Sequence, residues 1–374
     1  MDLSPEDSLR LNVLLANRPQ AIRIDENRMI VQGLGPRGEA TIRLNPNTRP
    51  DPYLRRVREL ISGHVLGSPG GYPIYLRRWT RMGQMRDDSL EQLLLLGEPE
   101  AVVAAVCAPG LTEELARRAW WAMEDAGNAR RMLANPVIAS SLMGQVLAAY
   151  LIEYLPFETE SEAIMESVRL VLQPGLLDEA QRDDLWRKSA RKHAYLVGFL
   201  QALPDGLPEP APARVLAEAV HDLAGQDNVA AVLLQRAYSW QGQSFIKAVA
   251  AVLAKPPSQD VVLAAFACLR EYFAPLRPAG DPDLALDDLL LDAARFVDAD
   301  DPDKRVAGIL RRIPALAPEI AAMRFFSGVG YGLIRPILSD STTLGSHMRR
   351  KLAPIIAPIR ERLDLLLSFN RFSR

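Results

Sequence analysis

From residue 87 onward, apolar residues recur at intervals of three and four in short segments that proline and glycine interrupt. Between Pro99 and Pro109, for example, Val102 and Val106 form one apolar stripe. This spacing indicates helices, because a helix completes a turn in 3.6 residues. Helices this short must pack against their neighbours along the chain to cover their apolar sides. The sequence therefore predicts a mainly α-helical protein, an irregular helical array similar to an α-solenoid or to HEAT repeats.

Capping residues and prolines predict where single helices begin and end. The expected N-caps and capping boxes lie at Ser4, at Thr112, at Thr159 with Glu162, and at Asp178 with Gln181. We also expect one long helix from Asn135 to Tyr154, a helix over residues 213–224, and a final helical stretch over residues 344–369 that Pro354 and Pro358 interrupt. The helix starts are unevenly spaced, so the sequence does not support a strict repeat family.

Apolar and polar residues alternate convincingly in one region, near the N-terminus. Ile22 and Ile24 alternate with polar neighbours, as do Ala40, Ile42 and Leu44, and a short apolar run lies between these segments. Alternation with a period of two is typical of strands that have one covered face. We therefore expect a small N-terminal α+β region that contains a three-stranded meander.

The length of 374 residues exceeds what one compact core usually holds. A proline-rich stretch, residues 203–212, is the best candidate for a linker. These features predict an N-terminal α+β region over residues 1–86 and a helical array with a first half over 87–203 and a second half over 213–374.

The composition is that of a soluble protein, with 48% hydrophobic and 24% charged residues. No apolar run approaches the roughly 20 residues that span a bilayer, and the acidic N-terminus does not resemble a signal peptide. Two cysteines cannot form a disulfide framework, which favours a reducing compartment. We therefore expect a cytoplasmic protein without membrane insertion.

Residues 33–38 read Gly-Leu-Gly-Pro-Arg-Gly and match the G-x-G-x-x-G pattern of dinucleotide-binding loops. That pattern binds a pyrophosphate when a helix follows it, because the helix N-terminus supplies N–H groups and a positive dipole. Here residues 39–44 alternate like a strand. We therefore expect the glycines to form a hairpin loop and reject nucleotide binding.

Three further patterns are weak signs of metal or phosphate binding. Glu218 and His221 have E-x-x-H spacing, but a di-iron site needs a second such pair and more glutamates. The acidic residues from 298 to 303 lack the glycine and glutamate of a calcium loop. The Gly-rich residues 327–332 lack the lysine of a phosphate-binding loop. The sequence therefore predicts no cofactor and no metal.

Arginine and aromatic residues are concentrated before residue 87, and such mixtures can hold phosphates and stack bases. This candidate binding stripe consists of Arg55, Arg56, Arg58, Tyr75, Arg77, Arg78, Trp79 and Arg81. RNA is thus a possible partner. The same spacing also describes an apolar helix face that packs on the array, with the arginines in solvent or paired with residues 87–301, where acidic side chains outnumber basic ones.

Cys107 and Cys268 are candidates for handling sulfur, although both lie among apolar residues. A reactive thiol needs a lowered pKa, which nearby positive charge or a helix N-terminus provides. Cys107 is expected near a helix C-terminus, and Arg270 follows Cys268 closely. Buried, unreactive thiols are the alternative.

Five stretches carry a resemblance to a known family: residues 1–11 and 21–25, residues 75–84 continuing into 93–100, and residues 115–123. They resemble the DsrS family of sulfur-oxidation proteins. This resemblance implies a cytoplasmic protein encoded with the dissimilatory sulfite reductase (Dsr) machinery of sulfur-oxidising bacteria. It implies no activity, and it assigns no catalytic or cofactor residue to this chain.

Taken with the lack of a catalytic constellation, these patterns predict a protein that is not an enzyme. We expect an accessory or regulatory protein of sulfur oxidation that binds proteins of the Dsr machinery through a helical scaffold. An RNA-binding regulator that uses the arginine stripe and a cysteine-based sulfur-transfer protein are the alternatives.

Overall fold

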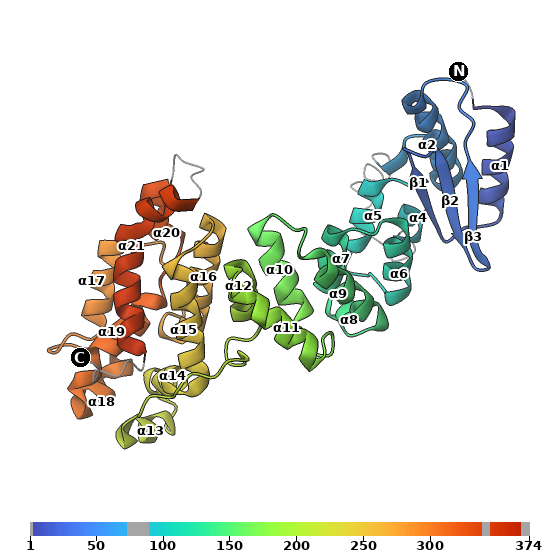
Figure 1. Cartoon of the computed structure of the whole chain (residues 1–374). Helices are drawn as coiled ribbons and strands as arrows, with labels where there is room; N and C mark the ends of the chain where they lie inside the picture. The colour runs from blue at the N-terminus through green and yellow to red at the C-terminus, as the bar shows by residue number, and fades with distance from the viewer. Residues whose placement is uncertain (1–2, 73–89, 339–344, 368–374) are drawn as a thin grey trace. The chain divides into compact units, whose positions relative to one another are not determined.

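The structure is a computed structural model that describes residues 3–72, 90–338 and 345–367. It is mainly helical, with a small three-stranded antiparallel sheet near the N-terminus, which confirms the predicted fold class (Figure 1). The chain forms two compact units, residues 1–156 with 173–177, and residues 157–172 with 178–374. The finer division that the sequence suggests stays a prediction.

The first unit begins with the sheet and two of its helices and continues as a series of short helices. Its elements are α1 (Pro5–Ala16), β1 (Ala21–Asp25), β2 (Ile30–Gly35), β3 (Gly38–Arg43), α2 (Pro50–Leu66), α4 (Leu90–Leu94), α5 (Pro99–Val106), α6 (Glu113–Ala122), α7 (Ala126–Leu133), α8 (Pro136–Ala139) and α9 (Leu142–Tyr154).

The strands form an antiparallel sheet in the order β1-β2-β3. Gly35 lies opposite Gly38, so Pro36 and Arg37 make a two-residue turn between β2 and β3. Gly38 has a φ of 119°, which a residue with a side chain rarely adopts. The glycines of the G-x-G-x-x-G pattern therefore belong to a hairpin, as predicted.

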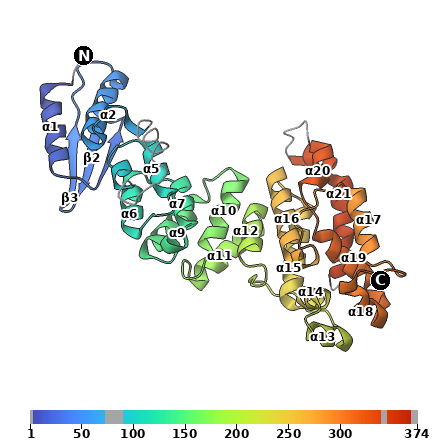
Figure 2. The ribbon, with the colours of Figure 1, turned by 180° about the vertical axis from the view of Figure 1, so that it is seen from behind.

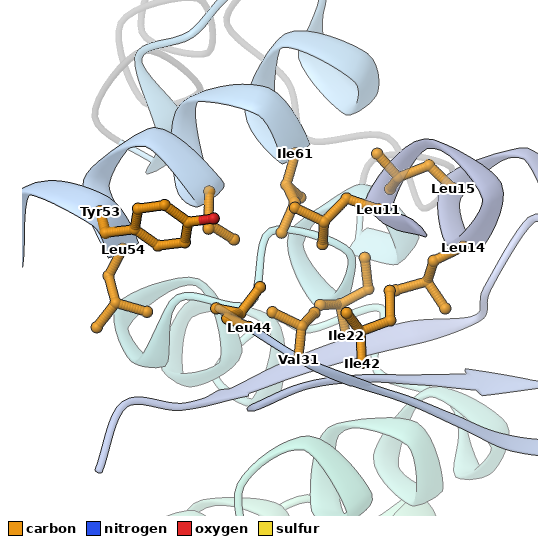
Figure 3. Packing of buried hydrophobic residues seen from close by; sticks show 11 residues of the cluster. Leu11, Leu14, Leu15, Ile22, Val31, Ile42, Leu44, Tyr53, Leu54 and Ile61 are labelled. Carbon is orange, nitrogen blue, oxygen red and sulfur yellow. The ribbon is translucent and has the colours of Figure 1, made fainter. Parts of the chain in front are cut away.

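Helices α1 and α2 cover one face of this sheet, and their apolar side chains form a hydrophobic cluster with those of the strands (Figure 3). The buried cluster comprises Leu11, Leu14, Leu15, Ile22, Val31, Ile42, Leu44, Tyr53, Leu54, Val57 and Ile61. Alternate residues of each strand contribute to it, because successive side chains of a strand point to opposite faces.

The other face of the sheet is polar and carries a row of hydrogen-bonded side chains. Arg23 Nε donates to Gln32 Oε1 at 2.7 Å, and Gln32 Nε2 donates to Thr41 Oγ1 at 3.4 Å. Trp121 of α6 lies on this face, with its indole N–H 2.6 Å from a Glu39 carboxylate oxygen and its ring under the Arg23 guanidinium. These contacts connect the polar face of the sheet to α6.

In the first unit, the helix starts predicted from capping residues are correct, but the prediction of one long helix is wrong. Ser4 Oγ and Thr112 Oγ1 accept backbone N–H groups at 3.2 and 3.3 Å and cap α1 and α6 as expected. The helix expected from Asn135 to Tyr154 is broken at Ser140 and Ser141 into α8 and α9. The two serine hydroxyls donate to backbone carbonyls of the preceding turn at 2.9 and 2.8 Å, and such bonds compete with continued helix.

The second unit is entirely helical within the described residues. Its elements are α10 (Ser161–Val171), α11 (Glu179–Ser189), α12 (His193–Ala202), α13 (Glu218–Ala224), α14 (Val229–Tyr238), α15 (Trp240–Ala254), α16 (Gln259–Tyr272), the 3₁₀ helix η2 (Ala274–Leu276), α17 (Leu286–Phe296), α18 (Lys304–Arg312), the 3₁₀ helix η3 (Pro314–Leu316), α19 (Ala317–Phe326), α20 (Tyr331–Leu338) and α21 (Gly345–Leu366). Helices α15 and α16 form its middle, with α12 on one side and α19 and α21 on the other (Figure 2).

One of the two predicted capping boxes in this unit is confirmed, and the other is wrong. Asp178 and Gln181 exchange the two expected hydrogen bonds at the start of α11. The box of Thr159 with Glu162 does not form, and α10 begins after Glu160 without a side-chain cap. A Glu158 carboxylate oxygen instead accepts the N–H groups of Thr159 and Glu160, and the first of these is the group that Glu162 would accept in a capping box.

Two further helix predictions in this unit are wrong because tertiary contacts override local signals. The helix expected over 213–224 begins only at Glu218, since the backbone N–H of Arg214 donates to Tyr238 O at 2.8 Å instead of joining a helix. Helix α21 runs through Pro354 and Pro358 without the expected interruption. Its buried residues Ile355, Ile359 and Leu363 hold it against its neighbours.

The Gly-rich residues 327–332 comprise the break between α19 and α20, residues 327–330, and the first two residues of α20. Their glycines allow close packing: a Cβ on Gly330 would lie 2.4 Å from an Asp281 carboxylate oxygen, and one on Gly332 would lie 2.7 Å from the backbone of Asp283. The space beside these glycines is filled by the chain itself, so they form no open cradle for a phosphate.

Candidate functional site

The structure places three members of the predicted arginine stripe, Arg55, Arg56 and Arg58, on α2. The other members, residues 75 to 81, lie outside the described residues. Arg56 pairs with Glu59 at 2.6 Å on the same helix, and Arg58 pairs with Glu26 from the turn between β1 and β2. Two of the three described arginines are thus neutralised by carboxylates.

Arg55 and Arg58 border a hollow of about 510 Å³ between α2, the residues around Gly70, and the start of α5. Its lining holds two arginines, Arg55 and Arg58, and the four glutamates Glu26, Glu59, Glu98 and Glu100. Nucleic acids bind where basic side chains outnumber acidic ones around a phosphate. The described part of the stripe does not favour RNA, and binding by the whole stripe stays a prediction.

The two cysteines have different environments. Cys107 is exposed and follows the last turn of α5, where its backbone N–H donates to Val103 O at 3.1 Å. The C-terminal end of a helix is its negative end, which disfavours a thiolate. Cys107 is therefore accessible, and it lies at the end of α5 opposite to the positive N-terminus that would activate a thiol.

Cys268 lies in α16 and is only 4% exposed. Burial, with a smaller contribution from the charge of Glu271, raises the pKa of its thiol to about 12. The guanidinium of Arg270, which is close in sequence, points to Asp281 at 2.8 Å and to Val329 O at 3.3 Å. The positive charge near Cys268 is thus committed to other partners, and sulfur transfer by either cysteine stays a prediction.

The pair Glu218 and His221 lies on α13, and acidic residues follow α17. Asp303 is the N-cap of α18 and accepts the backbone N–H of Arg305 at 2.9 Å. Within the ranges that the structure describes, no three histidine, cysteine, aspartate or glutamate side chains converge as a metal site would require.

Among the described helices, none combines the length and the apolar composition needed to cross a bilayer.

A surface that the sequence did not predict lies on α8 and α9. Val137 on α8 is 62% exposed, and Leu142 and Val146 on α9 are 76% and 51% exposed. Leu142, Val146 and the exposed Ala149 lie at positions i, i+4 and i+7, so they share one side of α9. We call Val137, Leu142, Val146 and Ala149 the α8–α9 face. On α9 this side is mainly apolar, with the polar residues Gln145 and Glu153 also exposed on it, and the described residues leave it uncovered.

The opposite side of α9 holds this face in place. Met143, Leu147 and Leu151 are buried against the neighbouring helices, and α9 contacts α7 closely. Tyr150 packs edge-on against Trp120 with ring centroids 4.8 Å apart. The α8–α9 face is therefore supported by a packed interior.

One signal in the sequence could have revealed this face. Only two polar residues, Gln145 and Glu153, lie on the exposed side of α9, whereas the outer side of a surface helix is usually polar. The low polarity of this segment was therefore the available signal.

Comparison of the chain with known proteins gives no matching family model, no matching curated protein and no matching solved structure.

Proposed function

We propose that this protein is a non-catalytic accessory or regulatory protein of bacterial dissimilatory sulfur oxidation that acts by binding other proteins. The biological setting rests on the sequence resemblance to the DsrS family in residues 1–11, 21–25, 75–84, 93–100 and 115–123. The observation that carries the mode of action is the α8–α9 face, which exposes a valine, a leucine and a second valine at more than half of their surface.

An exposed apolar face of this kind favours a protein partner. Isolated apolar side chains are common on protein surfaces, but a contiguous group on one helix side marks an interaction site more often. Covering the exposed parts of Leu142 and Val146 would contribute about 1 to 2 kcal/mol each to binding. The packed interior beneath α9 keeps the face in one conformation, so a partner does not have to order it.

Affinity capture tests this function. The tagged chain is expressed in a sulfur-oxidising bacterium grown on reduced sulfur, and the proteins that it retains are identified by mass spectrometry. We expect components of the Dsr machinery to be enriched over a tag-only control. Recovery of no Dsr-system protein would overturn the proposed function.

A matched pair of variants tests whether the α8–α9 face is the surface involved. Leu142→Glu/Val146→Glu places two charges on the face and should abolish the capture of Dsr-system proteins. Val215→Glu/Leu291→Glu makes the same two chemical changes at exposed positions of the second unit and should leave capture unchanged. Equal loss in both pairs, or no loss in the first pair, would contradict the assignment of this face.

A further inference from the structure

A groove of about 720 Å³ lies between α1 and the β2–β3 hairpin, and α1 and β3 border it side by side in both views (Figures 1 and 2). Leu9 and Val13 of α1 line one wall and are 65% and 54% exposed. They lie at positions i and i+4, so they point to the same side of the helix. Two large apolar side chains therefore face a space that the protein leaves open.

The glycines of the G-x-G-x-x-G pattern create this space. Gly33 lets α1 come close, since a Cβ there would lie 2.7 Å from Leu14 Cδ1. Toward the hairpin tip, Gly35, Gly38 and Ala40 carry little or no side chain on the same face of the sheet. Ala40 is exposed although it faces the side of α1, so the helix does not fill the hollow above it.

The backbone of β3 forms the other wall and is an open strand edge. β3 is the last strand in the order β1-β2-β3. Leu44 N–H donates to Met29 O at 2.8 Å, so the register turns the even-numbered residues of β3 toward β2. The N–H and C=O groups of Glu39, Thr41 and Arg43 consequently point away from the sheet. An unpaired edge of this kind is a template for a further strand.

The unpaired charge in the groove is positive. Arg37 lines the groove at the hairpin tip, is exposed, and makes no ion pair with any described residue. Arg10 also lines it and pairs with Glu6 one turn earlier. The Glu39 carboxylate is held on the other face of the sheet by the indole of Trp121. A ligand that carries a negative charge near the hairpin tip would therefore be favoured.

We propose that this groove binds an extended segment of a partner protein, which adds a fourth strand to the sheet along β3. The segment pairs with the outward backbone groups of Glu39, Thr41 and Arg43. Its apolar side chains, at every second position, fill the hollow beside Leu9 and Val13, and an acidic side chain reaches Arg37. Strand addition of this kind draws affinity from main-chain hydrogen bonds and specificity from alternate side chains.

The geometry favours a single strand over two other occupants. A dinucleotide needs a helix N-terminus after the glycines, and β3 stands there instead. A second copy that paired its own β3 across a two-fold axis would bring a second α1 onto the same face of the sheet, into the space that the groove offers to one strand. The groove uses none of the residues of the α8–α9 face, so either surface can be tested without the other.

A peptide array supplies the probe. Octapeptides carry Val, Ile, Leu or Phe at alternate positions, Thr or Ser between them, and Asp at one end. A control array has the same composition with the apolar residues in one block, and a second control replaces Asp by Lys. We expect the full-length chain to bind peptides of the alternating, Asp-ended array and to show slowed amide hydrogen exchange over residues 38–44 when they are bound. No binding above the blocked array would overturn the proposal.

Variants then locate the binding by fluorescence anisotropy of the best peptide. Thr41→Pro removes an outward N–H without removing a backbone hydrogen bond to β2, and Leu9→Glu/Val13→Glu charges the opposite wall. Each should weaken binding about tenfold or more, the effect of losing one good interaction. Val215→Glu/Leu291→Glu, the same two chemical changes at exposed positions of the second unit, should leave the affinity unchanged. Equal affinity in wild type and in both groove variants would overturn the proposal.

A charge swap tests the site without altering the strand. Arg37→Glu should reverse the preference of the chain from Asp-ended to Lys-ended peptides. Retention of the Asp preference would contradict the predicted contact with Arg37. Sedimentation of the chain alone tests the second-copy alternative: a dimer that Thr41→Pro dissociates would show that another copy occupies β3 and would overturn the peptide proposal.

Discussion

The phenol of Tyr53 on α2 donates a hydrogen bond to the buried carboxylate of Asp7 on α1, and so connects the two helices that cover the sheet. The same carboxylate oxygen accepts the backbone N–H of Asn45 at 2.7 Å, and the other oxygen has no hydrogen-bond partner among the described residues. Burial, with the neighbouring carboxylate, raises the pKa of the Tyr53 phenol. Asp7 is fully buried, so these few hydrogen-bond donors must offset the free-energy cost of removing its carboxylate from water.

Replacing Tyr53 by Phe is expected to destabilise the first unit by about 2 to 3 kcal/mol, because a buried carboxylate loses a donor. The free energy of unfolding from urea titrations followed by circular dichroism measures this loss. Combining Tyr53→Phe with Asp7→Leu should recover part of it, since no buried charge then remains. A loss below about 0.5 kcal/mol for Tyr53→Phe would show that water or another donor satisfies Asp7.

The bend between α8 and α9 depends on Gly144. A Cβ there would lie 2.5 Å from Ala139 O and 2.7 Å from Ile138 O. Gly144→Ala is therefore expected to lower the free energy of unfolding by about 1 to 3 kcal/mol, as overpacking does. In α2, Gly63 has no heavy atom near the corresponding position, so Gly63→Ala should stabilise the protein by about 0.5 to 1 kcal/mol. Thermal and urea unfolding of the two variants give the comparison, and the same sign in both would contradict it.

Local signals in the sequence were enough for the fold class and for many helix starts. Ser4, Thr112 and Asp178 cap helices through hydrogen bonds that reach only three residues along the chain. The alternation around Ile22 and Ile42 likewise reflects one face of a strand. Helix caps and the alternation of a strand depend on residues a few positions apart, and these residues can be recognised in the sequence.

The predictions that were wrong concern helices whose bounds depend on contacts with residues distant in the sequence. Pro354 and Pro358 lack backbone N–H donors, yet α21 continues through them because its apolar side is buried between other helices. Arg214 leaves the expected helix because its N–H and guanidinium find partners at Tyr238 and Leu365. Nothing within a few residues of these positions indicates such partners.

The candidate sites show the same limit. Leu9 and Val13 were part of an apolar series in the first helix, together with Leu11, Leu14 and Leu15. The structure divides this series into buried and exposed members. Five apolar residues within seven positions cannot all face one sheet, and this excess was the available signal. Which of them remains exposed depends on where α1 crosses the hairpin.

Asp303 is expected to make the stability of the second unit depend on acid pH. Its carboxylate accepts two hydrogen bonds from the Arg305 guanidinium and one from the Arg305 backbone, and these lower the pKa of Asp303 to about 2. A carboxylate whose pKa is lower in the folded state stabilises the fold above its unfolded pKa of about 3.9 and loses this effect as pH falls toward about 2. The pair is partly exposed, so water limits the contribution to about 1 kcal/mol or less.

Asp303→Asn isolates this charge, since asparagine is also a good N-cap. The variant should be less stable than the wild type by up to about 1 kcal/mol at pH 7, and the difference should vanish near pH 2. Urea unfolding at a series of pH values measures it, with Asp301→Asn as a control that removes an exposed charge two residues away. A constant difference at every pH would assign the effect of Asp303 to capping and not to its charge.

The two cysteines should differ sharply in reactivity. With a pKa near 12, the Cys268 thiol would be ionised in roughly one molecule in 10,000 at pH 8, and burial also blocks reagents. Cys107 is exposed. Titration of the native chain with a thiol-specific chromogenic disulfide should therefore show one rapid thiol, and a second only after unfolding in guanidinium. Cys107→Ser should remove the rapid reaction, and Cys268→Ser should leave it unchanged.

The same pair of variants bears on the sulfur-transfer alternative. A sulfur carrier must present a thiolate to its donor, so only Cys107 could be loaded in the folded chain. After incubation with a persulfide donor, labelling should be lost in Cys107→Ala and retained in Cys268→Ala. Cys268 is only 4% exposed. Labelling that requires Cys268 would therefore mean that α16 opens to expose its thiol. Labelling that persists when both cysteines are alanine would remove sulfur transfer by either thiol.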